Sequence, residues 1–379
     1  MIQFKNICLF VVIMLSFIRC TEIYTPNINS TTEALVVQGL ITDGTGPFTI
    51  NLSKAILYTS NSVSASNYVL SAQLTVTDNQ NNTFPLTETG NGNYTLPLSF
   101  KAVIGNSYIL HIQTKDGNTY ESNSQKLLQP LTYDSIHGMH NTEKYLGQDN
   151  QLRNVPGSDI LVDLFKTVST GDSVPLCRFN PVVTIQYQYT VTEKDTTNWH
   201  WEYNDWRSFQ LNTNENITED NSQTASAFIK NHSVGFVPIG MESYGMASPD
   251  KLTYYTYYLR IYQYTINRDS YNFYKGANSQ LAASGTIFDP VTAQLYGNMK
   301  CVNNPAKIVL GLFEVSSLSQ SAYVVIQSPY STNVLLQKVP YVDIPSSGTT
   351  QFKVWNLEFV PMPKDPAYNS TMPSWWMHY

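Results

Sequence analysis

Residues 34–57 read ALVVQGLITDGTGPFTINLSKAIL, and this segment decides the fold. Two apolar runs rich in β-branched residues flank the turn sequence Asp-Gly-Thr-Gly at residues 43–46. An Asp-Gly step between two such runs is a strong signal for a β-hairpin. The segment therefore predicts two antiparallel strands at the start of the folded part of the chain.

The same pattern continues through residues 72–122, where short alternating runs are separated by turn residues. The turns fall at residues 79–82 and 90–93, and an Asp-Gly step follows at 116–117. About seven short strands at intervals near ten residues are typical of a β-sandwich. We therefore predict an immunoglobulin-like β-sandwich over residues 34–130.

The chain from residue 131 onward also has the pattern of β structure, with longer loops. Its clearest strands are residues 159–165 (DILVDLF), 182–191 (VVTIQYQYTV) and 252–266 (LTYYTYYLRIYQYTI). One helix is predicted near residues 270–283, where Tyr271, Tyr274 and Leu281 recur at helical spacing. The expected fold class is thus mainly β, with the immunoglobulin-like sandwich followed by a larger β-rich domain with one helix over residues 131–379.

The first residues have the features of an export signal. Lys5 precedes an apolar run at residues 7–18 that ends close to Cys20. This run is shorter than the ~20 residues that a membrane-spanning helix needs, but it fits the apolar region of a signal peptide. We expect residues 1–19 to be the signal peptide.

Cys20 stands where a lipoprotein signal peptidase requires a cysteine. The expected mature protein begins at a diacylated Cys20, because two acyl chains hold a protein stably on a bilayer. Residues 20–33 lack apolar periodicity and are predicted to form a tether between the lipid and the fold. The alternative is a non-lipidated signal peptide that is cleaved elsewhere.

The composition excludes one class of partner. Only 13% of the residues are charged, against about a quarter in typical soluble proteins, and this uncharged polar composition is typical of extracellular β proteins. The 22 basic residues are outnumbered by 28 acidic residues, so the chain lacks the excess of positive charge that is typical of nucleic-acid-binding proteins.

Four cysteines are present, of which Cys8 lies in the signal peptide and Cys20 is the expected anchor. Cys177 and Cys301 remain for the folded part. An exported protein meets an oxidising environment, which favours a disulfide between them. Their spacing does not fix their distance. A Cys177–Cys301 bridge and two buried free thiols both stay open.

Sequence motifs for catalysis are absent. The chain has no G-x-S-x-G elbow, and its acidic residues are sparse. His137 and His140 are a candidate ligand pair, but zinc would need a third ligand that the spacing does not supply. We predict a polar loop there, with no metal, no cofactor and no enzyme activity.

The best candidate for binding is the aromatic segment WHWEYNDW at residues 199–206. Strand alternation directs Trp199, Trp201 and Tyr203 to one side, with Trp206 just beyond. Flat aromatic faces suit sugar rings or peptide side chains. If exposed, these residues form an interaction patch, and if buried, they belong to a core strand.

Several segments resemble a family of Bacteroidota lipoproteins known as domain of unknown function 4249. The resemblance rests on Cys20 and on residues 34–53, 105–122, 284–290 (SGTIFDP) and 296–317 (YGNMKCVNNPAKIVLGLFEVSS). Members are often encoded beside TonB-dependent outer-membrane receptors. The resemblance implies a surface-exposed outer-membrane lipoprotein that binds ligand or such a receptor during nutrient uptake. A structural or assembly lipoprotein of the envelope is the alternative, and a glycan or peptide hydrolase is a weaker one.

Three triplets resemble the O-glycosylation acceptor of exported proteins in the same phylum. In each of them Asp precedes Ser or Thr, and an apolar residue or Thr follows. The predicted acceptors are Ser135, Ser173 and Thr196.

Overall fold

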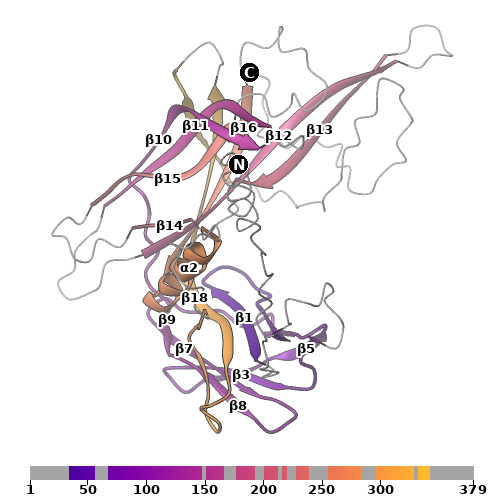
Figure 1. The fold of residues 1–379 in the computed structure, drawn as a ribbon, viewed down its shortest axis with the longest axis vertical. Helices are drawn as coiled ribbons and strands as arrows, with labels where there is room; N and C mark the ends of the chain where they lie inside the picture. Colours follow the sequence, from indigo (N-terminus) through magenta and orange to yellow (C-terminus); the bar gives the residue numbers. More distant parts are fainter. Residues whose placement is uncertain are drawn as a thin grey trace, which may run out of the picture. The chain divides into compact units, whose positions relative to one another are not determined.

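The structure is a computed structural model, and it describes residues 34–55, 67–146, 151–165, 176–192, 200–211, 216–219, 228–238, 255–282, 295–327 and 332–341 (Figure 1). The elements in chain order are β1 (Leu35–Thr42), β2 (Thr49–Lys54), β3 (Gln73–Asp78), β4 (Thr83–Pro85), β5 (Thr87–Gly90), β6 (Asn93–Thr95), β7 (Ser107–Gln113), β8 (Thr119–Ser122), β9 (Gln125–Lys126), β10 (Ser135–Leu146), β11 (Leu152–Phe165), β12 (Leu176–Thr192), β13 (His200–Gln210), β14 (Asn216–Ile217), β15 (Phe228–Pro238), β16 (Tyr255–Ile266), α2 (Arg268–Leu281), β17 (Met299–Cys301), β18 (Val309–Gln327) and β19 (Leu335–Val339). The described residues are mainly β with one helix, which confirms the predicted fold class.

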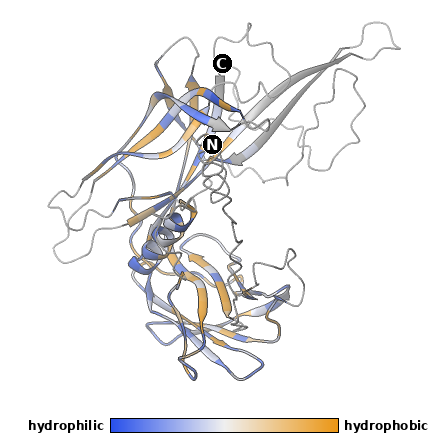
Figure 2. Ribbon diagram, in the orientation of Figure 1, coloured by the Kyte–Doolittle hydropathy of each residue, from blue (hydrophilic) through white to orange (hydrophobic). Residues whose placement is uncertain are grey.

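The first sandwich consists of β1 to β9, β17 and residues 309–316 of β18. One sheet holds β1, β2, β6 and β5 beside β18, and the facing sheet has the order β17-β8-β7-β3-β4, with β9 on β7. Buried residues such as Val37 and Ile50 from one sheet meet Val76 and Leu110 from the other in a first hydrophobic core. Hydrophobic and hydrophilic residues alternate along these strands (Figure 2), as the sequence pattern predicts.

Two strands of this sandwich come from the far end of the chain. β17 pairs with β8, and β18 pairs in parallel with β1 from Leu35↔Val309 to Thr42↔Ser316. The first core accordingly contains Met299 and Phe313. The predicted sandwich of residues 34–130 thus lacks two of its strands, because local turn signals identify hairpins but not a parallel pairing between distant segments.

The second sandwich consists of β10 to β16, residues 317–327 of β18, and β19. The sheet β10-β11-β15 faces the strands β13, β12, β16 and β18, with β14 on β12 and β19 on β18. A second hydrophobic core forms from residues of both sheets, among them Ile160, Val234, Leu259 and Val325.

β18 belongs to both sandwiches. Its residues Phe313 and Val315 lie in the first core, whereas Tyr323 and Val325 lie in the second. The sequence SSLSQS at residues 316–321 lies between them. This polar stretch separates the two cores along one continuous strand.

Residues 127–134, which link β9 to β10, contact β16 and β18 beside this polar stretch. The Leu131 N–H donates to the Thr265 hydroxyl at 2.9 Å, and the Tyr133 hydroxyl lies 2.8 Å from the Tyr323 hydroxyl. The Tyr133 hydroxyl also contacts the Ser321 hydroxyl. The backbone N–H of Leu131 and the hydroxyl of Tyr133 thus meet hydroxyl groups of β16 and β18.

Helix α2 is attached to the first sandwich through its N-terminus. The Asp269 carboxylate accepts hydrogen bonds of 2.9 Å from the side-chain amides of Asn123 and Gln125. The Asn267 amide donates to the carbonyls of Lys126 and Val315. A carboxylate in the first helical turn also complements the helix dipole. No helix within the described ranges is long and apolar enough to cross a membrane.

Close backbone approach at Gly311 makes the parallel pairing possible. Gly311 has φ +87°, and a Cβ atom there would lie 2.0 Å from the Val37 carbonyl oxygen of β1. The Asn298 side chain donates to the Phe313 carbonyl at 2.7 Å and accepts from its N–H at 3.0 Å. Backbone and side-chain amide groups thus surround β18 so tightly that a side chain at residue 311 has no room.

We predict that Gly311→Ala lowers the free energy of unfolding by roughly 2–4 kcal/mol, since it adds a steric clash to a left-handed backbone conformation. Gly105 is the matched control, because it has φ +92° but no atom within 4 Å of the position that an alanine methyl group would take. Gly105→Ala should lower the free energy of unfolding by only about 1 kcal/mol. Urea unfolding measures both, and equal losses would contradict the proposed close contact.

Candidate binding surface

A two-stranded ribbon extends from the second sandwich. β12 pairs with β16 only from Leu176 to Thr184, whereas its pairing with β13 continues to Thr192↔His200. Residues 185–192 and 200–207 therefore pair with each other beyond the last β16 partner, and we call these residues the ribbon. Figure 1 shows β12 and β13 side by side along this extension.

The ribbon contains part of the predicted aromatic patch. Trp201 pairs with Val191, and Tyr203 pairs with Tyr189. Residues paired across antiparallel strands share a face of the sheet, so these four residues belong to one face. Trp206 pairs with Gln186 and belongs to the other face.

The opposite face of the ribbon has a different composition. Its other members are Gln188, Thr190, Thr192, His200, Glu202 and Asn204. The first face also includes Ile185 and Tyr187 on β12, and Asp205 and Arg207 on β13. Aromatic residues are thus concentrated on the first face together with two charged residues, and the other face is mostly polar. The aromatic residues of β13 were predicted from sequence, but their partners on β12 were not, although alternation in IQYQYTV was an available signal.

Several other predicted positions lie outside the described residues, namely Cys20, Trp199, Ser173 and Thr196. Ser135 is described: it is exposed at the start of β10, and its hydroxyl donates to the Asp163 carboxylate at 2.8 Å. His137 and His140 lie within β10, so the predicted polar loop is wrong there. Among the residues that the structure describes, no three or more His, Cys, Asp and Glu side chains are grouped to hold a metal ion.

The two remaining cysteines are buried free thiols. Cys177 lies in the second core and Cys301 in the first, so the alternative of a disulfide between them is not formed. The Gln263 amide donates to the Cys177 sulfur at 3.3 Å, and burial raises the pKa of this thiol to about 11. Cys177 is therefore a thiol rather than a thiolate at neutral pH.

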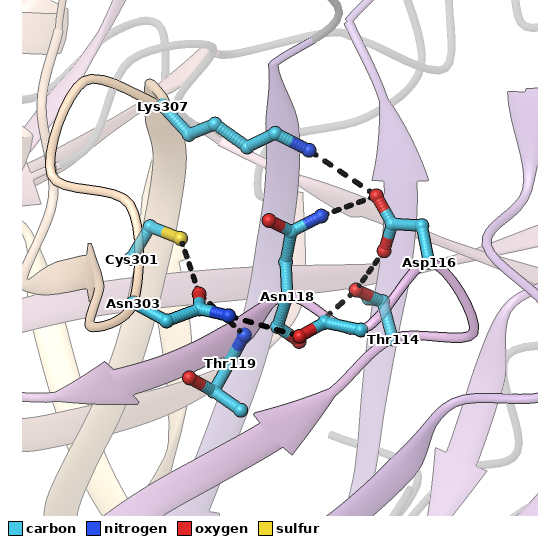
Figure 3. A network of polar contacts seen from close by, with 8 residues as sticks. Thr114, Asp116, Asn118, Thr119, Cys301, Asn303 and Lys307 are labelled. Atoms are coloured by element: carbon cyan, nitrogen blue, oxygen red, sulfur yellow. Dashed lines mark hydrogen bonds and ion pairs between the residues drawn. The ribbon is translucent and has the colours of Figure 1, made fainter.

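Cys301 borders a polar network between two loops of the first sandwich (Figure 3). Its thiol donates to the Asn303 side-chain oxygen at 3.4 Å, and Asn303 in turn bonds to the backbone of residues 117 and 119. Lys307 lies 3.2 Å from the Asp116 carboxylate. A hydrogen bond from the Thr114 hydroxyl is the main reason that the pKa of Asp116 is lowered to about 2. These contacts join the turn between β7 and β8 to the loop between β17 and β18.

A row of polar side chains crosses the outer face of the same sandwich. The Thr77 hydroxyl lies 2.9 Å from His111 Nε2, and His111 Nδ1 lies 3.6 Å from the Glu121 carboxylate. The residue types are those of a catalytic triad, but the second distance exceeds a hydrogen bond. Thr77 lies on β3, which pairs with β4 on one side and with β7 on the other. The backbone around Thr77 is therefore used for hydrogen bonds within the sheet. We interpret the row as cross-strand polar pairing.

A buried ion pair joins β12 to β18. Arg178 lies 3.4 Å from Glu314, and their side chains are only 11% and 2% exposed. The Arg178 guanidinium lies 4.3 Å from the ring centre of Tyr264 and 4.9 Å from that of Tyr274 on α2. The Tyr274 hydroxyl and the Ser316 hydroxyl, the latter at 2.8 Å, both donate to Glu314. This cluster was not predicted from sequence, although an arginine in LCRFN and a glutamate in LGLFEVS, each within an apolar strand, were available signals.

His232 is a second polar group in a largely apolar environment. Its Nε2 lies 2.7 Å from the Asn216 side-chain oxygen, while the Asn216 amide donates to the Ser233 carbonyl at 2.8 Å. This arrangement fixes the amide orientation and requires the proton on Nε2. The imidazole packs against Phe179, and burial lowers its pKa to about 4.

We predict that Arg178→Met lowers the free energy of unfolding by about 3 kcal/mol, because it leaves a buried carboxylate without its cation. Replacing both partners, as Arg178→Met with Glu314→Met, should restore much of this loss. Lys300→Met removes the exposed pair with Glu121 and should change the free energy of unfolding by less than about 1 kcal/mol. Urea unfolding of all three variants measures these changes in the free energy of unfolding. A double variant that is less stable than Arg178→Met would contradict the prediction.

We also predict an acid-sensitive contribution from His232. The folded pKa of about 4 lies below the ordinary value of 6.5, so between these values the unfolded chain binds a proton that the folded protein does not. The free energy of unfolding therefore falls as the pH is lowered from about 6.5 to 4, by up to about 3 kcal/mol from this group. His232→Gln should reduce the difference in the free energy of unfolding between pH 7 and pH 4.5, as measured by urea unfolding. His137→Gln, at an exposed position, should leave this difference unchanged. An unchanged pH dependence in His232→Gln would refute the assignment.

Comparison with known proteins identifies a family. A family model described as domain of unknown function (DUF4249) matches residues 21–322 of the chain, which includes β1 to β17 and most of β18. No curated protein matches the chain. The match covers all strands of the two sandwiches except β19 and the end of β18. The chain therefore belongs to the DUF4249 family.

Proposed function

We propose that the protein is a non-enzymatic outer-membrane lipoprotein of the cell surface, anchored through Cys20, and that it binds a TonB-dependent receptor or its ligand during nutrient uptake. The expected signal peptide and Cys20 support the anchor. Membership of the DUF4249 family supports the receptor as the partner, through the resemblance described above.

The observation that carries the proposal is the ribbon of β12 and β13. An isolated two-stranded hairpin is at best marginally stable in water. One face of this ribbon includes Tyr187, Tyr189, Trp201 and Tyr203, and also Asp205 and Arg207. Tyrosine and tryptophan are enriched in protein interfaces because their rings combine a large apolar area with a polar group. A partner that covers this face stabilises the ribbon and gains binding energy from the same contact.

The chain connects anchor and ribbon to different sandwiches. The predicted tether of residues 20–33 leads directly into β1, which pairs with the first half of β18. A fully extended tether of this length spans at most about 50 Å. The ribbon belongs to the second sandwich, which contains the other half of β18. In this proposal the first sandwich carries the anchor and the second carries the binding surface.

We predict that affinity purification of the native lipoprotein from detergent-solubilised outer membranes recovers a stoichiometric TonB-dependent receptor, identified by mass spectrometry. A variant with a shortened hairpin should lose the receptor. In this variant an Asn-Gly turn replaces residues 185–207, joining Thr184 to Ser208, whose hydroxyl groups already lie 2.7 Å apart.

The shortened variant keeps the residues that β12 contributes to the second core, namely Cys177, Phe179 and Val183. It should therefore retain cooperative thermal unfolding. The double variant Trp201→Ala with Tyr203→Ala should weaken binding in the same way without loss of the fold. Recovery of envelope-assembly proteins and no receptor by the unaltered protein would contradict the proposal and favour a structural lipoprotein.

A further inference from the structure

The sheet of β12, β16, β18 and β19 carries buried residues on both of its faces, although the second core covers one of them. We propose that the C-terminal segment of the chain, residues 342–379, packs on the other face and covers it. This inference does not depend on the proposed function, because it concerns a contact of the chain with itself.

Strand alternation separates the two faces of this sheet. Leu259 of β16 lies in the second core, so its neighbours Tyr258 and Arg260 point to the other face. Residues that pair with these two across β12 and β18 share that face. Its buried members, which we call the outer face, are Thr184, Tyr258, Arg260, Ala322 and Val324.

The outer face is as buried as the second core. The exposed fractions of its residues range from 0% for Tyr258 to 3% for Arg260 and Val324. A side chain in the middle of a sheet loses its contact with water only when another layer of chain covers that face. A further layer therefore lies on the outer face, on the side of the sheet away from the second core.

Helix α2 covers a different part of the same side of the sheet. The Tyr274 ring of α2 lies 4.9 Å from the Arg178 guanidinium, and alternation directs Arg178 to the same side of β12 as Thr184. Arg178 and Thr184 are about 20 Å apart along the strand, at about 3.3 Å per residue. The end of the helix is open to solvent, with Leu281 64% exposed. Another segment therefore covers the outer face.

The last described residues lead onto the outer face. The Tyr258 hydroxyl donates to the Pro340 carbonyl at 3.3 Å. The Tyr341 hydroxyl donates to the Tyr262 hydroxyl at 2.8 Å and accepts from the Gln320 amide at 3.1 Å. Tyr262 and Gln320 pair with each other beside the outer face. The chain thus leaves β19 at the outer face, and the C-terminal segment follows directly.

The sequence of the C-terminal segment suits this position. It contains the run FKVWNLEFV at residues 352–360. In an extended chain Trp355, Leu357 and Phe359 share one side, and burying such side chains is strongly favourable. A run of this length spans about 30 Å, whereas four neighbouring strands occupy only about 15 Å across the sheet. We therefore assign these three residues to the contact with the outer face.

Photo-cross-linking of the full chain tests the contact directly. A benzophenone amino acid takes the place of Leu357, and mass spectrometry of the irradiated monomer identifies the peptides that are joined to it. We expect cross-links to residues 255–266 of β16 or 317–327 of β18. The same amino acid in place of Asn356, on the other side of the run, is the matched control and should give at least tenfold fewer of these cross-links.

Hydrogen exchange tests whether the contact covers the sheet. Leu357→Asp should speed exchange in residues 255–266 and 317–327 at least tenfold, because a charged side chain is strongly disfavoured at a buried apolar contact. Residues 107–113 of β7, in the first sandwich, should exchange at an unchanged rate. Asn356→Asp introduces the same charge on the other side of the run and should leave all three peptides unchanged.

Each alternative cover of the outer face gives a different result. Cross-links from residue 357 only to other parts of the monomer, or unchanged exchange in Leu357→Asp, would show that another segment covers the face and would overturn the inference. Cross-links between two chains would assign the cover to a second copy, which also overturns it. If Leu357→Asp fails to fold, the cross-links of the otherwise unaltered chain decide. Recovery of the receptor, which tests the proposed function, is a separate measurement.

Discussion

The main-chain pairing of β18 is the interaction on which the rest of the structure depends. One half of this strand bonds in parallel with β1, and the other half bonds in antiparallel with β16. Phe313 fills one core and Val325 fills the other, so two hydrophobic cores share one covalently continuous backbone. The ladder with β1 and the ladder with β16 follow one another along the same extended backbone, so β18 joins the two sandwiches. The glycine at residue 311 is a local requirement of this arrangement.

The opposite face of the first half of the same strand carries charge, next to a small third apolar cluster of Leu176, Ile266 and Tyr271. Glu314 and Ser316 alternate with the residues that enter the first core, and they meet Arg178 and two tyrosines beneath α2. Buried charges need both a counter-ion and hydrogen bonds, since either charge alone is strongly disfavoured in an apolar environment. The cluster meets this need with groups from β12, β16, β18 and α2. It therefore specifies which elements come together where the two sandwiches join.

The parts of this fold that follow from local sequence were predictable, and the parts that follow from distant pairing were not. The Asp-Gly turn at residues 43–44, the alternation in SYILHIQ and the helix near residue 270 all depend on neighbouring residues, and the structure contains them. The parallel pairing of β1 with β18 depends on the whole chain between them, so no local pattern indicates it. The same holds for the candidate site. Alternation identified Trp201 and Tyr203 as one face, but only the register with β12 adds Tyr189 and Val191 to it.

The parallel pairing of β1 also limits when the first sandwich can be completed. β1, the first of the described strands, finds its partner on β18, one of the last. The Leu318 N–H likewise donates to the carboxylate of Asp43, 275 residues earlier in the chain. Closing so long a loop is entropically costly, and folds with many distant contacts form slowly. The first sandwich is complete only when β17 and β18 are present, although its first nine strands, β1 to β9, are synthesised early. A chain built in this way leaves β1 without its partner β18 until most of the chain has been synthesised.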